Sequence, residues 1–206
     1  MGKVIEVAPG LREVHRDARG AVRVDRLRAE LAVADLLEAL GVDLSNEDLS
    51  GTPRRVARMY EELLTPRPFN PTTFENDAGY DEMVIARDIP FTSLCAHHML
   101  PFSGIAHVGY LPGDRIIGLS KLARVVTYFA RNLQVQERLT KQVADWLDRE
   151  LQPRGVGVVV RAEHQCMTIR GIQAAGSTTV TSTMTGLLRE NLATREEFLA
   201  LCGQTP

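Results

Sequence analysis

Two short clusters of cysteine and histidine constrain the fold of this chain more than any other feature. The first reads Cys95-Ala-His-His98, and the second, far along the chain, reads His164-Gln-Cys166. Two thiols and an imidazole form a ligand set of intermediate softness that suits Zn²⁺. If Cys95, His98 and Cys166 hold one ion, the fold has to bring these two distant segments together.

Three protein ligands leave one position of a tetrahedral ion for water, as in catalytic zinc sites. His97 and His164 would then remain beside the metal as unligated imidazoles that carry protons, an arrangement suited to hydrolysis. A closed structural site with His97 or His164 as a fourth ligand is an alternative, although adjacent histidines rarely bind one ion together. A disulfide between Cys95 and Cys166 is a second alternative, expected after loss of the metal.

The composition indicates one domain with an appendage. The chain has 206 residues, of which 44% are hydrophobic, so it can form a core. Its 24 basic and 26 acidic residues give a net charge of −2, which indicates neither nucleic acid nor membrane as a partner. Because we find no membrane-spanning run, no signal peptide and only three cysteines, we expect a soluble cytoplasmic protein with reduced thiols and a buried Cys202.

The first part of the chain predicts helices. Residues 1–22 show no periodicity and are expected to form a flexible arm. A helix is predicted from the N-cap Asp25 to Gly41, and a second one begins at Thr52-Pro53. The predicted apolar face of the first helix is Leu27, Leu31, Ala34, Leu37 and Leu40. The predicted buried stripe of the second is Val56, Met59, Tyr60, Leu63 and Leu64.

The rest of the chain predicts strands, two helices and then further strands, which is an α+β fold. The expected strands are 83–91, 105–111, 155–167 and 178–184. The expected helices are one capped by Ser120, one with Val135, Leu139, Val143, Trp146 and Leu151 on one face, and a final one with a capping box at Thr194–Glu197. Alternation within strand 155–167 predicts that His164 and Cys166 share one face.

We therefore place an N-terminal helical region at residues 23–75 and a catalytic domain at 76–206. Trp146 and Met184 are predicted to be core residues, and His107 is predicted to be a structural histidine within a strand.

Several cations gather near the metal motif. Lys121 and Arg124 lie at i, i+3 near a predicted helix N-terminus, where free N–H groups attract an anion. Arg55 and Arg58 repeat this spacing, and Arg170 follows the second cluster. Each cation taken alone is also typical of a solvated surface. Together they indicate an anionic substrate, and phosphate matches the planar donors of arginine.

Gln136-Glu137 begins the second helix of the predicted pair. A carboxylate in a first turn is favoured by the helix dipole, which is sufficient to explain Glu137. Glu137 is also placed to accept hydrogen bonds from amide-like N–H groups of a substrate.

Taken together, these motifs resemble the GTP cyclohydrolase I family. The segments that carry the resemblance are Cys95–His98, Ile117–Arg124, Gln134–Thr140, Glu163–Met167, Arg170-Gly171 and Thr179–Met184. They occur in the family's order from about Gly51 to Phe198. One departure is Ala96, where the family commonly has glutamate, at a position without a metal or catalytic role.

The resemblance implies an enzyme that hydrolyses the imidazole ring of GTP, releases C8 as formate and forms 7,8-dihydroneopterin triphosphate, the first step of tetrahydrofolate and pterin synthesis. It implies Zn²⁺ held by Cys95, His98 and Cys166. His97 would protonate the purine N7, and His164 would serve ring opening and the later proton transfers.

The resemblance also implies substrate contacts. Ser120 would lie near the ribose and phosphates, and Glu137, with Gln136 beside it, would bind the guanine edge. The implied triphosphate ligands are Lys121, Arg124 and Arg170, with Arg55 and Arg58 from a neighbouring subunit. The implied fold is the tunnelling fold, an antiparallel four-stranded sheet with two helices on one side, assembled as a decamer of two stacked pentamers.

Other classes fit the sequence less well. A zinc nucleobase deaminase would show H-x-E followed by P-C-x-x-C, and neither pattern occurs. A related pterin enzyme of the tunnelling fold would have a different ligand set. A catalytically silent zinc-stabilised assembly or nucleotide-binding module is disfavoured by the presence of His97, His164, Ser120 and Glu137.

Overall fold

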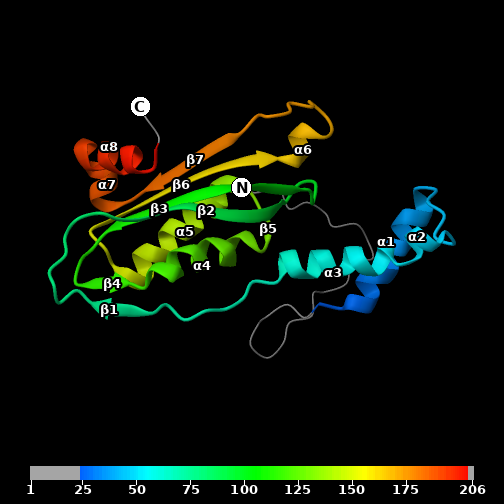
Figure 1. Ribbon diagram of the computed structural model, residues 1–206, viewed down its shortest axis with the longest axis horizontal. Helices are drawn as coiled ribbons and strands as arrows, with labels where there is room; N and C mark the ends of the chain where they lie inside the picture. The colour runs from blue at the N-terminus through cyan, green and yellow to red at the C-terminus, as the bar shows by residue number, and fades with distance from the viewer. Residues whose placement is uncertain (1–23, 204–206) are drawn as a thin grey trace, which may run out of the picture. The chain divides into compact units, whose positions relative to one another are not determined.

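The computed structural model describes residues 24–203, so the predicted arm at 1–22 lies outside the described residues (Figure 1). The chain forms two compact units, residues 1–61 and 62–206. None of the described helices is long and apolar enough to cross a membrane.

The described part of the first unit is helical. It contains α1 (Arg26–Ala39), α2 (Glu47–Ser50) and most of α3 (Thr52–Leu64). The Asp25 carboxylate accepts the Arg28 N–H at 3.0 Å, which confirms the predicted cap. The short helix α2, capped by the Asn46 side chain, was not predicted.

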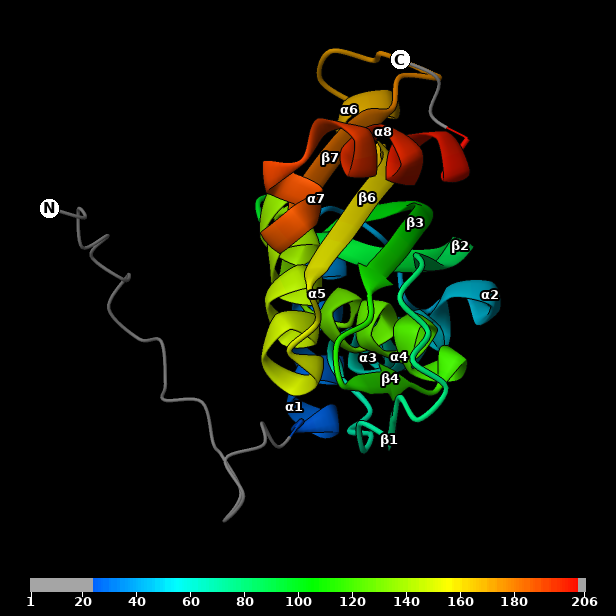
Figure 2. The ribbon, with the colours of Figure 1, turned by 90° about the vertical axis from the view of Figure 1, so that its left-hand side faces the viewer.

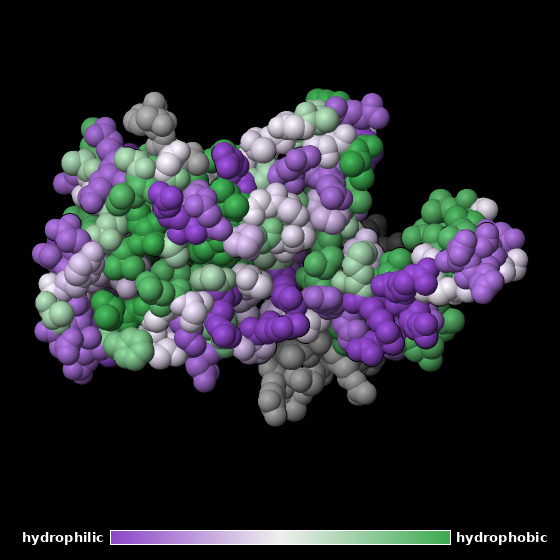
Figure 3. Space-filling view, in the orientation of Figure 1, coloured by the Kyte–Doolittle hydropathy of each residue, from purple (hydrophilic) through white to green (hydrophobic). Residues whose placement is uncertain are grey.

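The predicted apolar stripes of α1 and α3 are not buried. No described residue of α1 is buried, and Leu27, Leu31 and Leu40 are 68%, 57% and 71% exposed. In α3 the buried residues are Pro53 and Ala57, while Met59 is 45% exposed, so the predicted buried stripe is wrong. Helical spacing shows which side chains share a face, but burial also requires an apolar partner for that face. Figure 3 shows apolar surface on this unit.

A mixed sheet forms the centre of the second unit (Figures 1 and 2). Four long strands pair antiparallel in the order β2-β3-β6-β7, and the short β5 pairs parallel with the end of β2. The strands of this sheet are β2 (Val84–Cys95), β3 (Pro101–Leu111), β5 (Leu133–Gln134), β6 (Gly155–His164) and β7 (Thr179–Met184). A separate ribbon pairs β1 (Thr73–Glu75) with β4 (Arg115–Ile117). The predicted α+β class is confirmed.

The main core lies between one face of this sheet and two helices, α4 (Leu119–Ala130) and α5 (Gln136–Leu151). Val156, Val158 and Val160, which alternate along β6, point into this core. Trp146 belongs to the same cluster, which confirms it as a core residue. Ser120 does not cap α4, because the N-cap residue is Gly118 and it makes no side-chain capping bond.

The opposite face of the sheet is covered by α7 (Gly186–Glu190) and α8 (Leu192–Leu201). Val159, which alternates with the core-facing valines of β6, packs with Leu188, Phe198 and Cys202. A Cβ at Gly157 would lie 2.6 Å from Leu188 Cδ2, so close packing requires glycine there. Cys202 is buried as predicted. The cap of α8 is Asn191, which accepts the Thr194 N–H, and not the predicted Thr194.

His107 is a buried histidine within β3, and it lies opposite an irregularity in the pairing of β2 with β3. The register shifts between Ala86 and Ile89, where Asp88 adopts a φ of 54°. The Asp88 N–H donates to His107 Nδ1 at 3.3 Å. Burial lowers the pKa of His107; Asp88 acts against this shift, while Arg87 and Arg161 act with it.

This geometry predicts an acid-sensitive fold. Because the pKa of His107 is lowered on folding, the unfolded chain binds more protons between the folded pKa and about 6.5. The contribution of His107 to the free energy of unfolding is therefore fully present above about pH 6.5. It declines below that pH, with a slope of at most about 1.4 kcal/mol per pH unit. We expect the melting temperature to fall between pH 7.5 and 5.5. In His107→Asn, whose amide oxygen can accept the same N–H but does not titrate, the fall should be smaller; an equal fall would contradict the assignment.

Candidate metal centre and active site

The first cluster lies in the hairpin that joins β2 to β3. Cys95 is the last residue of β2, and its carbonyl accepts the N–H groups of His98 at 3.4 Å and Met99 at 2.9 Å. Met99 closes the hairpin with a left-handed φ of 55°. This tight turn brings the His98 side chain back beside Cys95.

The second cluster reaches the same place through the sheet and a helical turn. Phe102 of β3 pairs with His164, so the end of β6 lies beside the hairpin. The strand ends at His164, and Cys166 lies in α6 (Gln165–Thr168). The prediction that strand alternation aligns His164 with Cys166 is therefore wrong. The single helical turn, rather than the pleat, directs Cys166 toward Cys95.

Three potential ligand atoms converge at this point. Cys95 Sγ lies 3.9 Å from Cys166 Sγ and 3.9 Å from His98 Nδ1, and the ligand atoms of the three residues all lie within 4.8 Å of one another. For a tetrahedral zinc, ordinary bond lengths give an S···S separation of about 3.8 Å and an S···N separation of about 3.6 Å. The spacing and the donor atoms therefore fit a metal ion of this kind.

The alternatives of a fourth ligand and a disulfide find little support. His97 Nδ1 lies 3.8 Å from Cys95 Sγ, but among the described residues the mutually close group contains neither His97 nor His164. All three cysteines are free, and 3.9 Å is far longer than the roughly 2.0 Å of a disulfide. An open, three-ligand centre is what this geometry favours.

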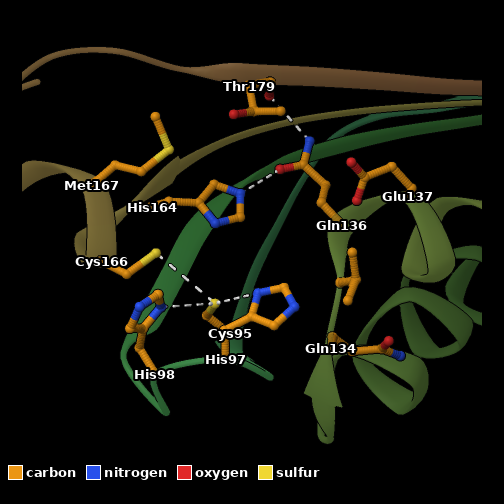
Figure 4. Close-up of a pocket in the computed structure, with 11 residues that line it drawn as sticks. Cys95, His97, His98, Gln134, Gln136, Glu137, His164, Cys166, Met167 and Thr179 are labelled. Carbon is orange, nitrogen blue, oxygen red and sulfur yellow. Dashed lines mark hydrogen bonds between the residues drawn. The ribbon is translucent and has the colours of Figure 1, made fainter. Parts of the chain in front are cut away.

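A cavity of about 320 Å³ lies beside the three ligands (Figure 4). His97 enters it from the hairpin, His164 from the end of β6, and Glu137 from the first turn of α5. The complete lining is Cys95, His97, His98, Gln134, Val135, Gln136, Glu137, His164, Cys166, Met167 and Thr179. Gln134, Val135, Met167 and Thr179 were not predicted as site residues, although each lies within or at the end of a motif that carries the family resemblance.

The His164 ring is held on two sides. It stacks on Phe102, with centroids 4.5 Å apart and 3° between the planes, and its Nε2 lies 2.7 Å from Gln136 Oε1. Burial lowers the pKa of His164, and the charge of Glu137 acts in the opposite direction. Burial, and next the neighbouring Cys95 thiol, raise the pKa of the Cys166 thiol. Two thiols this close ionise together more easily when a cation lies between them.

Three other predicted residues do not line this cavity. The C-terminal end of α4 lies near the centre, where the Ser93 hydroxyl donates to the Ala130 carbonyl at 2.6 Å. Ser120, Lys121 and Arg124 belong to the first half of this helix, whose 12 residues span roughly 18 Å. Arg124 instead lines a separate cavity of about 240 Å³, together with Arg67 and Arg131 among others.

The remaining predicted arginines are placed separately. Arg170 Nη1 lies 3.2 Å from His98 Nε2, so this arginine stands next to the ligand group. Arg55 and Arg58 belong to the first unit, in α3. Arg55 Nη2 donates to the Asp48 carbonyl and to Thr52 Oγ1, which ties it to the start of its own helix.

A metal group of two thiols and an imidazole, flanked by two histidines in a cavity, is typical of a metal-dependent hydrolase. The sequence family described as GTP cyclohydrolase I matches residues 29–203. The chain belongs to this family, and the enzyme class predicted from the sequence, GTP cyclohydrolase I, is thereby confirmed.

The curated relatives agree over almost their whole length. The GTP cyclohydrolase 1 of Aquifex aeolicus (strain VF5) is 51% identical over 178 residues, 86% of this chain and 97% of that protein. That of Allorhizobium ampelinum is 52% identical over 184 residues, 87% of this chain and 92% of that protein. That of Mycobacterium tuberculosis (strain ATCC 25177 / H37Ra) is 48% identical over 192 residues, 90% of this chain and 95% of that protein.

One solved structure, that of the archaeosine synthase QueF-Like in the apo form, covers 52% of this chain and 94% of its own, with a TM-score of 0.40 and 14% identity. Similarity at this level is too low to support an argument about the fold.

Proposed function

We propose that this chain uses the Cys95–His98–Cys166 centre to convert GTP into 7,8-dihydroneopterin triphosphate and formate, the first step of tetrahydrofolate and pterin synthesis. The observation that carries the proposal is the convergence of these three ligand atoms within 4.8 Å, in a cavity that His97, His164 and Glu137 also line. Zn²⁺ is the metal that suits this donor set, and when bound it supplies a nucleophilic water at neutral pH.

The residues around the centre would transfer protons and bind the substrate. His97 would donate a proton to the purine N7, which makes C8 more open to attack, and His164 would transfer protons during ring opening. Glu137 would accept hydrogen bonds from the guanine N1–H and exocyclic amine, a pattern that adenine does not offer. Arg170 would bind phosphate oxygens. Holding the purine by both edges orients C8 toward the three ligands.

The assay for this function is direct. Protein loaded with Zn²⁺ and incubated with GTP should release one formate per dihydroneopterin triphosphate formed, with ATP as the control substrate that it rejects. Absence of both products from protein with bound zinc and an intact oligomer would overturn the proposal.

We also propose that the chain has the tunnelling fold and that its active sites are shared between subunits of a decamer. Within residues 24–203, both edges of the main sheet are open over most of their length, since β5 pairs only with Leu94 and Cys95 of β2, and β7 pairs only with β6. Joining such edges between subunits removes an aggregation hazard and would build a barrel. Lys121 and Arg124, which lie away from this chain's own cavity, would then contact the triphosphate bound to a neighbour.

Mixing two inactive variants tests this sharing. Cys166→Ala removes a ligand, and Arg124→Ala removes a triphosphate contact. If each site takes these residues from different subunits, random mixed oligomers should regain up to about a quarter of wild-type activity. The same pairing with Arg55→Ala tests the contribution of α3. No recovery in oligomers that native mass spectrometry shows to be mixed would contradict the shared site.

A further inference from the structure

Gln136 is a buried amide at the beginning of α5, with 2% exposure, that contacts three neighbouring elements. Its Nε2 lies 3.1 Å from the Val160 carbonyl of β6, 3.0 Å from the Thr179 carbonyl and 3.2 Å from Thr181 Oγ1 of β7. Its Oε1 lies 2.7 Å from Nε2 of His164. The role of this residue follows from which of these atoms can donate a proton and which can only accept one.

The direction of every bond in the group is determined. The carbonyls of Val160 and Thr179 only accept, so the NH₂ end of the Gln136 side chain has to face them. The Thr140 hydroxyl donates to the backbone carbonyl of Gln136 at 2.8 Å and lies 2.6 Å from Thr181 Oγ1. The Thr140 proton is thus used, so the Thr181 hydroxyl donates to Thr140. The two hydrogens of the Gln136 NH₂ group are shared among the Val160 and Thr179 carbonyls and Thr181 Oγ1. The reversed amide would place Oε1 against two carbonyl oxygens.

The consequence reaches His164. With the amide in this orientation, Gln136 Oε1 can only accept, so His164 Nε2 carries the hydrogen of this bond. The stack on Phe102 holds the ring in its plane, and a flip within that plane would place Cε1 where Nε2 lies and lose the bond to Gln136. Figure 4 shows the other nitrogen, Nδ1, on the side of the ring that faces Cys95 and His97.

We propose that Gln136 is a positioning residue that fixes the imidazole of His164 in the Nε2–H tautomer and so presents the Nδ1 lone pair to the cavity. This deepens the proposed function, because it names Nδ1 as the atom of His164 that exchanges protons with the substrate, and it rests on that function for its activity readout. It also changes the role expected for Gln136, whose NH₂ group is used entirely within the chain rather than for binding substrate.

The test compares Gln136→Met, which keeps the length of the side chain but removes the oxygen, with the wild type. Two measurements apply: the tautomer of His164 from ¹⁵N chemical shifts of labelled imidazoles, and the separate effects on kcat and on the affinity for GTP. We expect the single tautomer to give way to a mixture, kcat to fall about 10- to 100-fold, and the affinity for GTP to stay within about twofold.

One further variant separates positioning from a general loss of structure. Gln134→Met alters a neighbouring buried amide that lines the same cavity but bonds Phe129 and Gln142, so it should leave the His164 signal unchanged. A single, unchanged tautomer in Gln136→Met, or a weaker affinity for GTP with kcat intact, would overturn the proposal.

The proposed function can fail independently of this inference. The tautomer is read on protein without substrate. A wild-type chain that shows the Nε2–H tautomer but releases no formate would contradict the reaction while supporting the positioning role.

Discussion

Replacing Cys166 with alanine should remove both the metal and the activity. Cys166 Sγ is one of three ligand atoms, and the remaining pair, Cys95 and His98, leaves half of a tetrahedral site without protein donors. We expect the zinc content after dialysis to fall from one ion per chain to near zero. Formate release should fall by at least about 10³-fold, since the metal contributes several kcal/mol to the transition state.

Cys202→Ala is the matched control for this variant. Cys202 is buried with Phe198 on the opposite face of the sheet, and burial raises the pKa of its thiol to about 11. Its replacement should cost about 1 kcal/mol of stability while zinc and activity remain. Full zinc content in Cys166→Ala, measured by atomic emission, would show that this thiol is not a ligand.

The second large effect concerns two adjacent histidines with opposite expected roles. His97 lines the cavity outside the mutually close ligand group, whereas His98 belongs to that group. His97→Ala should keep one zinc per chain and lose about 10²- to 10⁴-fold in kcat, the usual contribution of a general acid. His98→Ala should lose the metal as well.

The pair of variants separates a proton donor from a ligand. Zinc analysis and formate release are measured on the same samples. If His97→Ala loses its zinc while His98→Ala retains it, the two roles are reversed, and the open site would be built on His97.

The sequence was most informative where local chemistry decides structure. The alternating run at 155–167 predicted a strand, and the structure has β6 at Gly155–His164, because a period of two is typical of a strand whose successive side chains point to opposite faces. The cap at Asp25 and the start of α3 at Thr52-Pro53 followed from the preferences of single residues. The grouping of Cys95, His98 and Cys166, whose ligand atoms lie within 4.8 Å of one another, was proposed from residue types and from the family resemblance.

Sequence reasoning failed where a distant partner decides the outcome. It extended strand β6 through Cys166 to Met167, although the chain turns into α6 immediately after His164. It predicted a buried apolar stripe on α3, whereas the buried residues of this helix are Pro53 and Ala57. Periodicity also carried no sign that Val160, Thr179 and Thr181 would surround the Gln136 amide.

By itself the sequence determined the chemistry of this protein: the thiols and imidazoles available, their family pattern, and the α+β order of the elements. Only the tertiary structure decided which of those groups meet. Ligand distances, the stacking of His164 on Phe102 and the orientation of the Gln136 amide depend on segments brought together by the pairing of β3 with β6. Side-chain types are carried by each residue, whereas contacts depend on long-range packing, which no local pattern encodes.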